Sequence, residues 1–172
     1  EALKTSLGLK EFYLHGHSCG TALALEYYLK YPKGIKAIIF NSPYFSTSLW
    51  KADADTLITT LPDSIQLAIK TGEKNHDYGS PAYKNANEVF YKNFGVRKTK
   101  LTSELDTSTA KGNEFIYNYM WGPTEFTAAG TLINYNRVQN LKTIKVPTLF
   151  ITGYCDAARP VTVKYFQSLV PN

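Results

Sequence analysis

Apolar residues gather in three short runs that have the length and spacing of buried β-strands. The runs cover residues 11–15, 35–40 and 146–153, and an apolar helical stretch over 19–31 separates the first two. A strand, a helix and a second strand within about 30 residues form a βαβ unit with a right-handed crossover. The pattern therefore predicts an α/β fold with a parallel sheet. The nearly continuous apolar character of the 35–40 strand indicates burial on both faces.

The middle of the chain has a different pattern, with helical spacing and few strand signals. We expect helices around 49–61, 65–69, 87–94 and 114–121, and a last helix over 161–169 that begins after Pro160. Helices inserted after a strand are typical of a cap over an active site. The predicted organisation is a core formed by residues 1–43 and 131–172, with a helical cap over 44–130.

A Gly-x-Ser-x-Gly motif lies where the first strand meets its helix. It consists of Gly16, Ser18 and Gly20. A serine on such a sharp bend presents its hydroxyl above the sheet edge, and the glycines let neighbouring backbone approach closely. The backbone N–H of Cys19, at the start of the helix, points to an oxyanion site. The alternative is an ordinary strand-to-helix turn in which Ser18 caps the helix.

An aspartate follows the third strand, at the edge where α/β sheets carry their ligands. Asp156 there suits the acid of a serine hydrolase, in the chain order Ser, Asp, His. The alternative is an Asx-turn aspartate that caps the helix near Pro160. The three histidines, His15, His17 and His76, all precede Asp156, and none occupies the expected position of the base. Because a serine without a base is a poor nucleophile, this stretch alone is expected to be inactive.

Composition excludes several other classes of function. The chain has 172 residues, a net charge of +5, 44% hydrophobic residues and no apolar run long enough for a membrane span. The basic residues Lys92, Arg97, Lys98 and Lys100 indicate a solvated surface rather than a nucleic-acid site. The two cysteines fit no metal-binding pattern and are expected as free thiols of a cytoplasmic protein. We expect no metal, cofactor, nucleic-acid or membrane partner, and the oligomeric state stays open.

Several segments together resemble the proline iminopeptidases. GHSCG at 16–20 with its ALALEY helix resembles their nucleophile region, and VPTL at 146–149 through Asp156 resembles their acid-bearing segment. MWGPTEFT at 120–127, followed by GTL, is the narrower match. The resemblance covers essentially the whole chain. It implies an α/β-hydrolase-fold serine peptidase that releases an N-terminal residue, often proline, from a small peptide.

The resemblance also implies roles for individual residues. Ser18 would be the nucleophile and Asp156 the acid, Glu125 would bind the free α-amino group, and Tyr117 would line the same site. A carboxylate in an aromatic, partly dehydrated pocket is well suited to an ammonium group. For Glu125 the alternative is a helix-start carboxylate after Pro123 that interacts with the helix dipole.

The chain departs from the family pattern at three points. Thr21 replaces a second glycine after the elbow, Ala157 replaces a glutamate after the acid, and the upstream oxyanion segment and terminal histidine segment of the family are absent. We therefore expect a fragment truncated at both ends, with unpaired sheet edges and poor solubility on its own. The alternative functions are another serine hydrolase, an esterase or amidase, and a non-catalytic binding protein that kept the fold.

Overall fold

The computed structural model describes residues 1–97 and 102–171. Lys98 and Lys100 of the predicted basic surface lie outside these ranges. The chain folds as two compact units, unit 1 formed by residues 1–46 and 136–172, and unit 2 formed by residues 47–135. Each unit is described by itself below.

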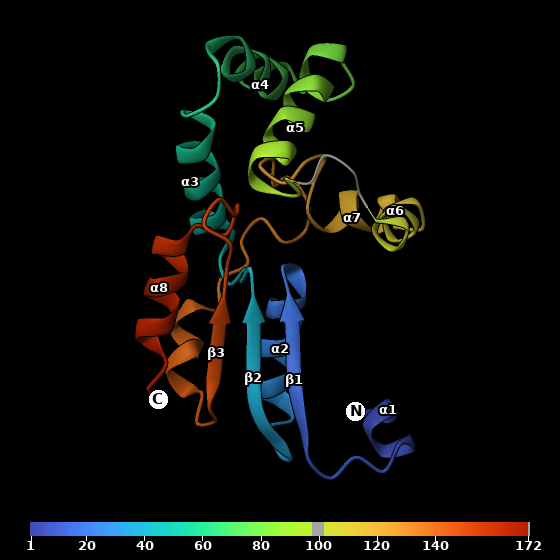
Figure 1. Cartoon of the computed structure of the whole chain (residues 1–172), viewed down its shortest axis with the longest axis vertical. Coiled ribbons are helices and arrows are strands. Elements are labelled where there is room, and N and C mark those ends of the chain that lie inside the picture. The colour runs from blue at the N-terminus through green and yellow to red at the C-terminus, as the bar shows by residue number, and fades with distance from the viewer. Residues whose placement is uncertain (98–101, 172) are drawn as a thin grey trace. The chain divides into compact units, whose positions relative to one another are not determined.

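Unit 1 is built on a parallel sheet of three strands in the order β1-β2-β3, with β1 at Phe12–His17, β2 at Ile35–Asn41 and β3 at Thr148–Ile151. α2 (Cys19–Lys30) connects β1 to β2 and packs against both strands. In Figure 1 it lies behind them. The remaining elements are α1 (Ala2–Ser6), the 3-10 helix η1 (Val138–Thr143) and α8 (Pro160–Leu169), which contacts β3. The predicted α/β architecture with parallel strands is confirmed.

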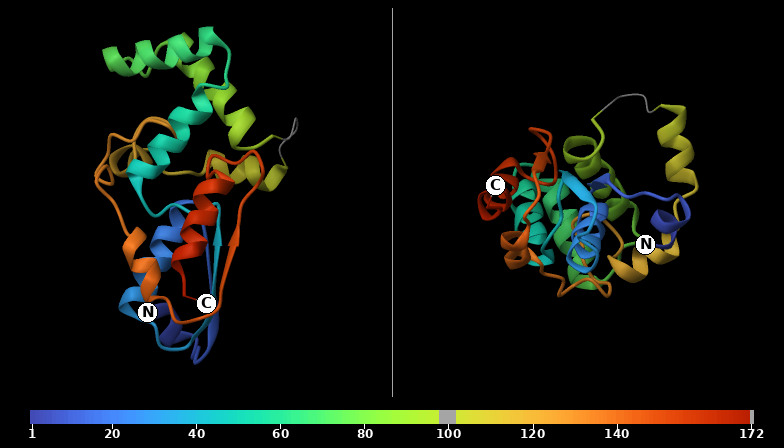
Figure 2. Two further views of the ribbon diagram at one scale, coloured as in Figure 1. Left: turned by 90° about the vertical axis from the view of Figure 1, so that its left-hand side faces the viewer. Right: turned by 90° about the horizontal axis from the view of Figure 1, so that it is seen from below.

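One face of this sheet carries the core of unit 1. Ile38 and Phe40 of β2 are fully buried, and the Phe40 ring packs edge to face against Phe45, with 4.9 Å between the ring centroids. Phe45 in turn contacts Phe166 of α8 in the same geometry. In Figure 2, α2 and η1 lie on the same side of the strands. This aromatic cluster packs β2 against α8 through the ring of Phe45.

The other face of the sheet is more open among the described residues. Tyr13 is 72% exposed and Leu149 is 52% exposed, while Ile39 of the central strand is only partly buried. The expected burial of β2 on both faces is therefore met on one face only. The near-continuous apolar run predicts a strand correctly, but an apolar run by itself does not report which face is covered.

Unit 2 is helical, as the spacing of its apolar residues predicts. Its helices are α3 (Thr47–Ile58), α4 (Asp63–Asn75), α5 (Pro81–Phe94), α6 (Ser103–Ala110) and α7 (Glu114–Met120). α4 and α5 pack closely because Gly72 leaves room for the ring of Tyr83; a Cβ on this glycine would lie 2.3 Å from the ring. Ile69, Tyr83, Phe90 and Phe126 form the buried centre.

Several element boundaries differ from the predictions. α5 begins at Pro81, because Ser80 accepts a hydrogen bond from the Tyr83 N–H and Pro81 occupies the first helical turn. α6 was not predicted; its eight residues bury no side chain, so it lacks the apolar stripe that periodicity detects. β3 covers four residues of the predicted eight. No helix within the described residues has the length and apolar character needed to cross a membrane.

Candidate active site

Ser18 sits in a strained backbone conformation between β1 and α2. Its φ of 52° and ψ of −127° are sparsely populated for a residue with a side chain, and its N–H donates to the Asn41 carbonyl at the end of β2. Among the described residues, the Ser18 hydroxyl makes no capping bond to α2, which argues against the helix-cap alternative. The side chain is partly exposed at the carboxyl edge of the sheet.

Gly16 allows the close approach of α2 that this bend requires. A Cβ at Gly16 would lie 2.3 Å from the carbonyl oxygen of Gly20 and 2.7 Å from the Cα of Thr21. A Cβ built on Gly20 meets no described atom within 4 Å apart from its chain neighbours and the adjacent backbone of α2. The predicted need for close packing therefore holds at Gly16 and finds no steric basis at Gly20 within the described residues.

Gly16→Ala is expected to destabilise the protein by about 3 kcal/mol or more, because the added methyl group meets backbone atoms that cannot rotate away. Gly20→Ala is the matched control; it adds the same methyl group to open space in a helix, and we expect it to be neutral or stabilising by up to about 1 kcal/mol. Urea unfolding of both variants measures the difference. Equal stabilities would contradict the close-approach role of Gly16.

Thr21 fits without crowding and connects the elbow to the loop after β2. The side chain is fully buried, and its hydroxyl donates to the Ser18 carbonyl at 2.6 Å and accepts from the Tyr44 N–H at 2.8 Å. These two bonds join segments that lie 23 residues apart in the sequence. The departure from the glycine of the family therefore adds a polar link at the elbow instead of a steric conflict.

Asp156 is held by donors on both sides of its carboxylate. Its Oδ2 accepts from the Ser42 hydroxyl at 2.6 Å and from the Gly153 N–H at 3.4 Å, and its Oδ1 accepts from the Ala158 N–H at 2.8 Å. The Ala158 bond is an Asx-turn, so that part of the alternative interpretation is correct. Arg159, rather than Asp156, is the N-cap of α8, and no side chain caps this helix end among the described residues.

Ser42 was not singled out from the sequence. It follows β2 directly, is 9% exposed, and adopts a left-handed φ of 49° while its N–H donates to the Ile151 carbonyl of β3. This conformation turns its hydroxyl toward Asp156. The only sequence signal is the position of Ser42 at the end of a parallel strand, where α/β folds gather polar groups.

The strand ends bring the candidate catalytic groups to one edge of unit 1. His17 of β1 pairs with Asn41 of β2, and Asn41 pairs with Ile151 of β3, so Ser18 and Asp156 follow the outer strands on either side of Ser42. Cys19, whose N–H is the candidate oxyanion donor, is the first residue of α2. Cys19 and Cys155 both lie in the described ranges, and no disulfide bond joins them.

The three histidines are divided between the two units. His15 and His17 are exposed on β1, and no hydrogen bond in this part of the chain joins them to Ser18 or Asp156. His76 lies in unit 2, with its Nδ1 3.2 Å from the Tyr78 hydroxyl. That none of the three serves as the base stays a prediction.

In unit 2, the segment over 121–130 forms a tight loop. The amides of Ala129 and Gly130 both donate to the Trp121 carbonyl, at 2.8 and 2.7 Å. A Cβ on Gly122, whose φ is 147°, would lie 2.2 Å from the Thr127 carbonyl, and one on Gly130 would lie 2.4 Å from Met120. Glycine is therefore required at both positions for the loop to close.

Buried polar side chains attach this loop to α4 and α5. The Tyr83 hydroxyl lies 2.7 Å from the Thr127 hydroxyl and 3.3 Å from that of Thr124. The Thr127 hydroxyl also donates to the Glu73 carboxylate at 2.8 Å. Burial raises the pKa of the Tyr83 hydroxyl, which keeps it protonated as a member of this network.

Glu125 projects from this loop beside aromatic side chains. The Tyr117 hydroxyl of α7 donates to its Oε1 at 3.0 Å, so these two predicted site residues lie in direct contact. Partial burial raises the pKa of the Tyr91 hydroxyl on α5, and the negative charge of Glu125 raises it further. Glu125 lies in a loop and not at a helix start, so the helix-dipole alternative is wrong.

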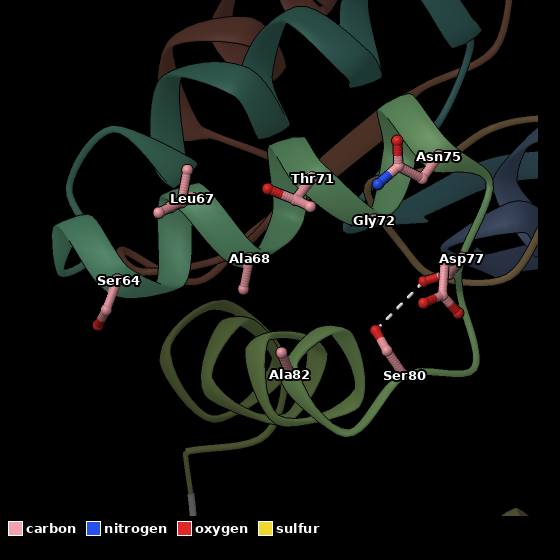
Figure 3. Close-up of a pocket in the computed structure, with 9 residues that line it drawn as sticks. All are labelled: Ser64, Leu67, Ala68, Thr71, Gly72, Asn75, Asp77, Ser80 and Ala82. Carbon is pink, nitrogen blue, oxygen red and sulfur yellow. Dashed lines mark hydrogen bonds between the residues drawn. The ribbon is translucent and has the colours of Figure 1, made fainter.

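A hollow in unit 2 lies apart from the candidate site residues. A hollow of about 290 Å³ lies between α4 and α5, and Figure 3 shows small and polar side chains such as Ser64, Thr71 and Asn75 on its wall. No proposed site residue lines it. In the described ranges, no group of three or more His, Cys, Asp or Glu side chains is arranged to hold a metal ion.

Proline iminopeptidases are among the known proteins with similar sequences. The chain is 39% identical over 170 residues to a proline iminopeptidase of Heyndrickxia coagulans, covering 98% of this chain and 59% of that protein. It is 36% identical over 173 residues to one of Lactobacillus delbrueckii subsp. lactis, covering 100% of this chain and 59% of the relative. The chain therefore spans about three fifths of the length of these relatives.

Solved structures agree with the sequence matches. The proline iminopeptidase of Mycobacterium smegmatis aligns with a TM-score of 0.88 at 28% identity, covering 99% of this chain and 58% of that one. VinJ aligns with a TM-score of 0.92 at 27% identity, covering 99% and 59%. The model of the alpha/beta hydrolase fold family matches residues 1–166. With this match over nearly all of its length, the chain belongs to the alpha/beta hydrolase fold family.

Proposed function

We propose that the protein containing this chain is a serine exopeptidase that releases an N-terminal residue, preferably proline, from small peptides. Three observations support the proposal: the strained elbow at Ser18, the firmly held Asp156, and Glu125 in contact with Tyr117. The contact between Tyr117 and Glu125 carries the choice of an exopeptidase, because a partly buried carboxylate beside aromatic rings suits the ammonium group of a free N-terminus.

In the proposed reaction, Ser18 Oγ attacks the carbonyl carbon of the first residue and forms a tetrahedral intermediate. A histidine supplied by the rest of the protein takes the hydroxyl proton and passes it to the leaving amine. Asp156 orients that histidine and stabilises its charged form. The N–H of Cys19 donates to the oxyanion, aided by an upstream amide. Water then attacks the acyl-enzyme and releases the first residue.

The free amine of the substrate is the proposed partner of Glu125. An ammonium group gains a charge-assisted hydrogen bond from a carboxylate, and neighbouring aromatic faces add cation–π attraction. The Tyr117 hydroxyl donates to Oε1 of Glu125, so an aromatic side chain lies directly beside the proposed amine-binding carboxylate. We also propose that unit 2, which extends from 47 to 135, serves as the cap predicted for 44–130. The cytoplasmic location remains a prediction.

The decisive experiment uses the protein encoded by the complete reading frame that contains this chain. Three substrates are compared: L-proline p-nitroanilide, its N-acetylated form and p-nitrophenyl acetate. We expect release from the free prolyl arylamide and almost none from the acetylated one, because acetylation removes the charge that Glu125 binds. Hydrolysis of the ester with no cleavage of either arylamide would identify an esterase and contradict the proposal. Cleavage of none of the three would favour a non-catalytic binding protein.

A further inference from the structure

Two tryptophan side chains hold consecutive carbonyl groups of the loop that carries Glu125. The indole N–H of Trp121 donates to the Thr124 carbonyl at 2.8 Å, and the indole N–H of Trp50 donates to the Glu125 carbonyl at 2.8 Å. The rings meet edge to face, with 6.2 Å between centroids and 88° between planes. Both rings are buried, so these are shielded hydrogen bonds.

Trp50 comes from a distant part of the sequence. It lies on α3, 75 residues before Glu125, whereas Trp121 belongs to the loop itself. Trp50 therefore anchors Glu125 through its carbonyl, and Tyr117 anchors it through its carboxylate. A carboxylate selects an ammonium group by direction as well as charge, so the backbone anchor sets where the anion points.

We propose that Trp50 is a positioning residue for substrate specificity, which orients Glu125 toward the N-terminal ammonium of the substrate. The inference rests on the proposed function, because it assigns Trp50 a part in amine recognition by Glu125. Its indole N–H, rather than the bulk of its ring, supplies this role. Loss of the N–H removes this bond from the Glu125 carbonyl, so the direction of the carboxylate is less well fixed.

The test uses Trp50→Phe in the protein from the complete reading frame, with L-proline p-nitroanilide and p-nitrophenyl acetate as substrates. Phenylalanine keeps an aromatic ring and removes the donor. We expect KM for the arylamide to rise about threefold to tenfold, the value of one net hydrogen bond. Hydrolysis of the ester, which has no amine, should change less than about twofold.

A double-mutant cycle decides whether Trp50 acts through Glu125. In a Glu125→Ala background, Trp50→Phe should leave the ratio of arylamide to ester activity unchanged, because the carboxylate that Trp50 positions is gone while the anchored carbonyl remains. Should Trp50→Phe fail to fold, Trp50 is replaced by β-(3-benzothienyl)alanine, which has nearly the shape of tryptophan and no N–H. The same rise in KM is expected there.

The outcomes separate this inference from the proposed function. If Glu125→Ala shows the amine-specific loss while removal of the Trp50 N–H lowers both activities equally, or acts in full without Glu125, the function stands and the role of Trp50 is refuted. If Glu125→Ala itself affects both substrates equally, amine recognition by Glu125 fails, and the role of Trp50 fails with it.

Discussion

Ser18→Ala is expected to lower the peptidase activity of the complete protein by roughly 10⁴- to 10⁶-fold, leaving only the acceleration that comes from binding and the oxyanion site. The reason is geometric as well as chemical. The bend between β1 and α2 places this hydroxyl at the carboxyl edge of the sheet, and an alanine there keeps the bend while removing the attacking oxygen. Release of p-nitroaniline from the prolyl arylamide measures the loss.

Two controls show that this loss arises from chemistry and not from unfolding. Ser168→Ala removes an exposed serine hydroxyl from α8, where it bonds only locally to the Tyr165 carbonyl, and should retain full activity. Ser18→Gly should be as inactive as Ser18→Ala but more stable by about 1 kcal/mol, because glycine relieves the strain at a φ of 52°. An Ser18→Ala protein that keeps more than a few per cent of activity would disprove the nucleophile assignment.

Glu125→Ala is expected to lower kcat/KM for L-proline p-nitroanilide by about 100-fold, with little effect on p-nitrophenyl acetate. The ammonium of the arylamide loses its anionic partner, and the Tyr117 hydroxyl loses its acceptor at the same time. The ester carries no positive charge, so its binding does not depend on this carboxylate. Glu125→Gln keeps the shape of the side chain without its charge, and its kcat/KM for the arylamide should lie between those of the unchanged protein and Glu125→Ala.

Glu114→Ala is the matched control for net charge. Glu114 is an exposed acid at the start of α7, in the same unit, and its removal should change both activities by less than about twofold. Similar losses of arylamide activity in Glu125→Ala and Glu114→Ala would show that the loss arises from the change in net charge and not from a direct contact with the substrate. Equal losses of arylamide and ester activity in Glu125→Ala would refute an amine-binding role.

The local signals in the sequence were strong where neighbouring residues control the backbone. The elbow can be predicted from Gly16 and Ser18 because the residues that meet there are close in the sequence. The close approach of α2 brings Gly20 against Gly16, only four positions away. The start of α8 at Pro160 follows equally from local chemistry, because proline suits the first turn of a helix. The family resemblance implied that Tyr117 and Glu125 share a site, and the hydrogen bond between them came from the structure.

Contacts between distant segments had no comparable signal. Ser42 meets Asp156 across 114 residues, and Trp50 meets Glu125 across 75 residues. Neither serine nor tryptophan is unusual where these two residues stand. Their roles depend on how strands pair and how α3 packs, and a single sequence does not record pairings at such separation.

The order of apolar and polar residues was enough to specify parallel strands, a helical insertion and a serine on a turn between strand and helix, because these depend on periodicity and on the conformational limits of glycine and proline. The partners of the reactive groups came from folding itself. Packing brought a hydroxyl to Asp156, an indole N–H to the Glu125 carbonyl and the Tyr44 N–H to the Thr21 hydroxyl. Hydrogen bonds of this kind are set by three-dimensional proximity, for which linear order provides no measure.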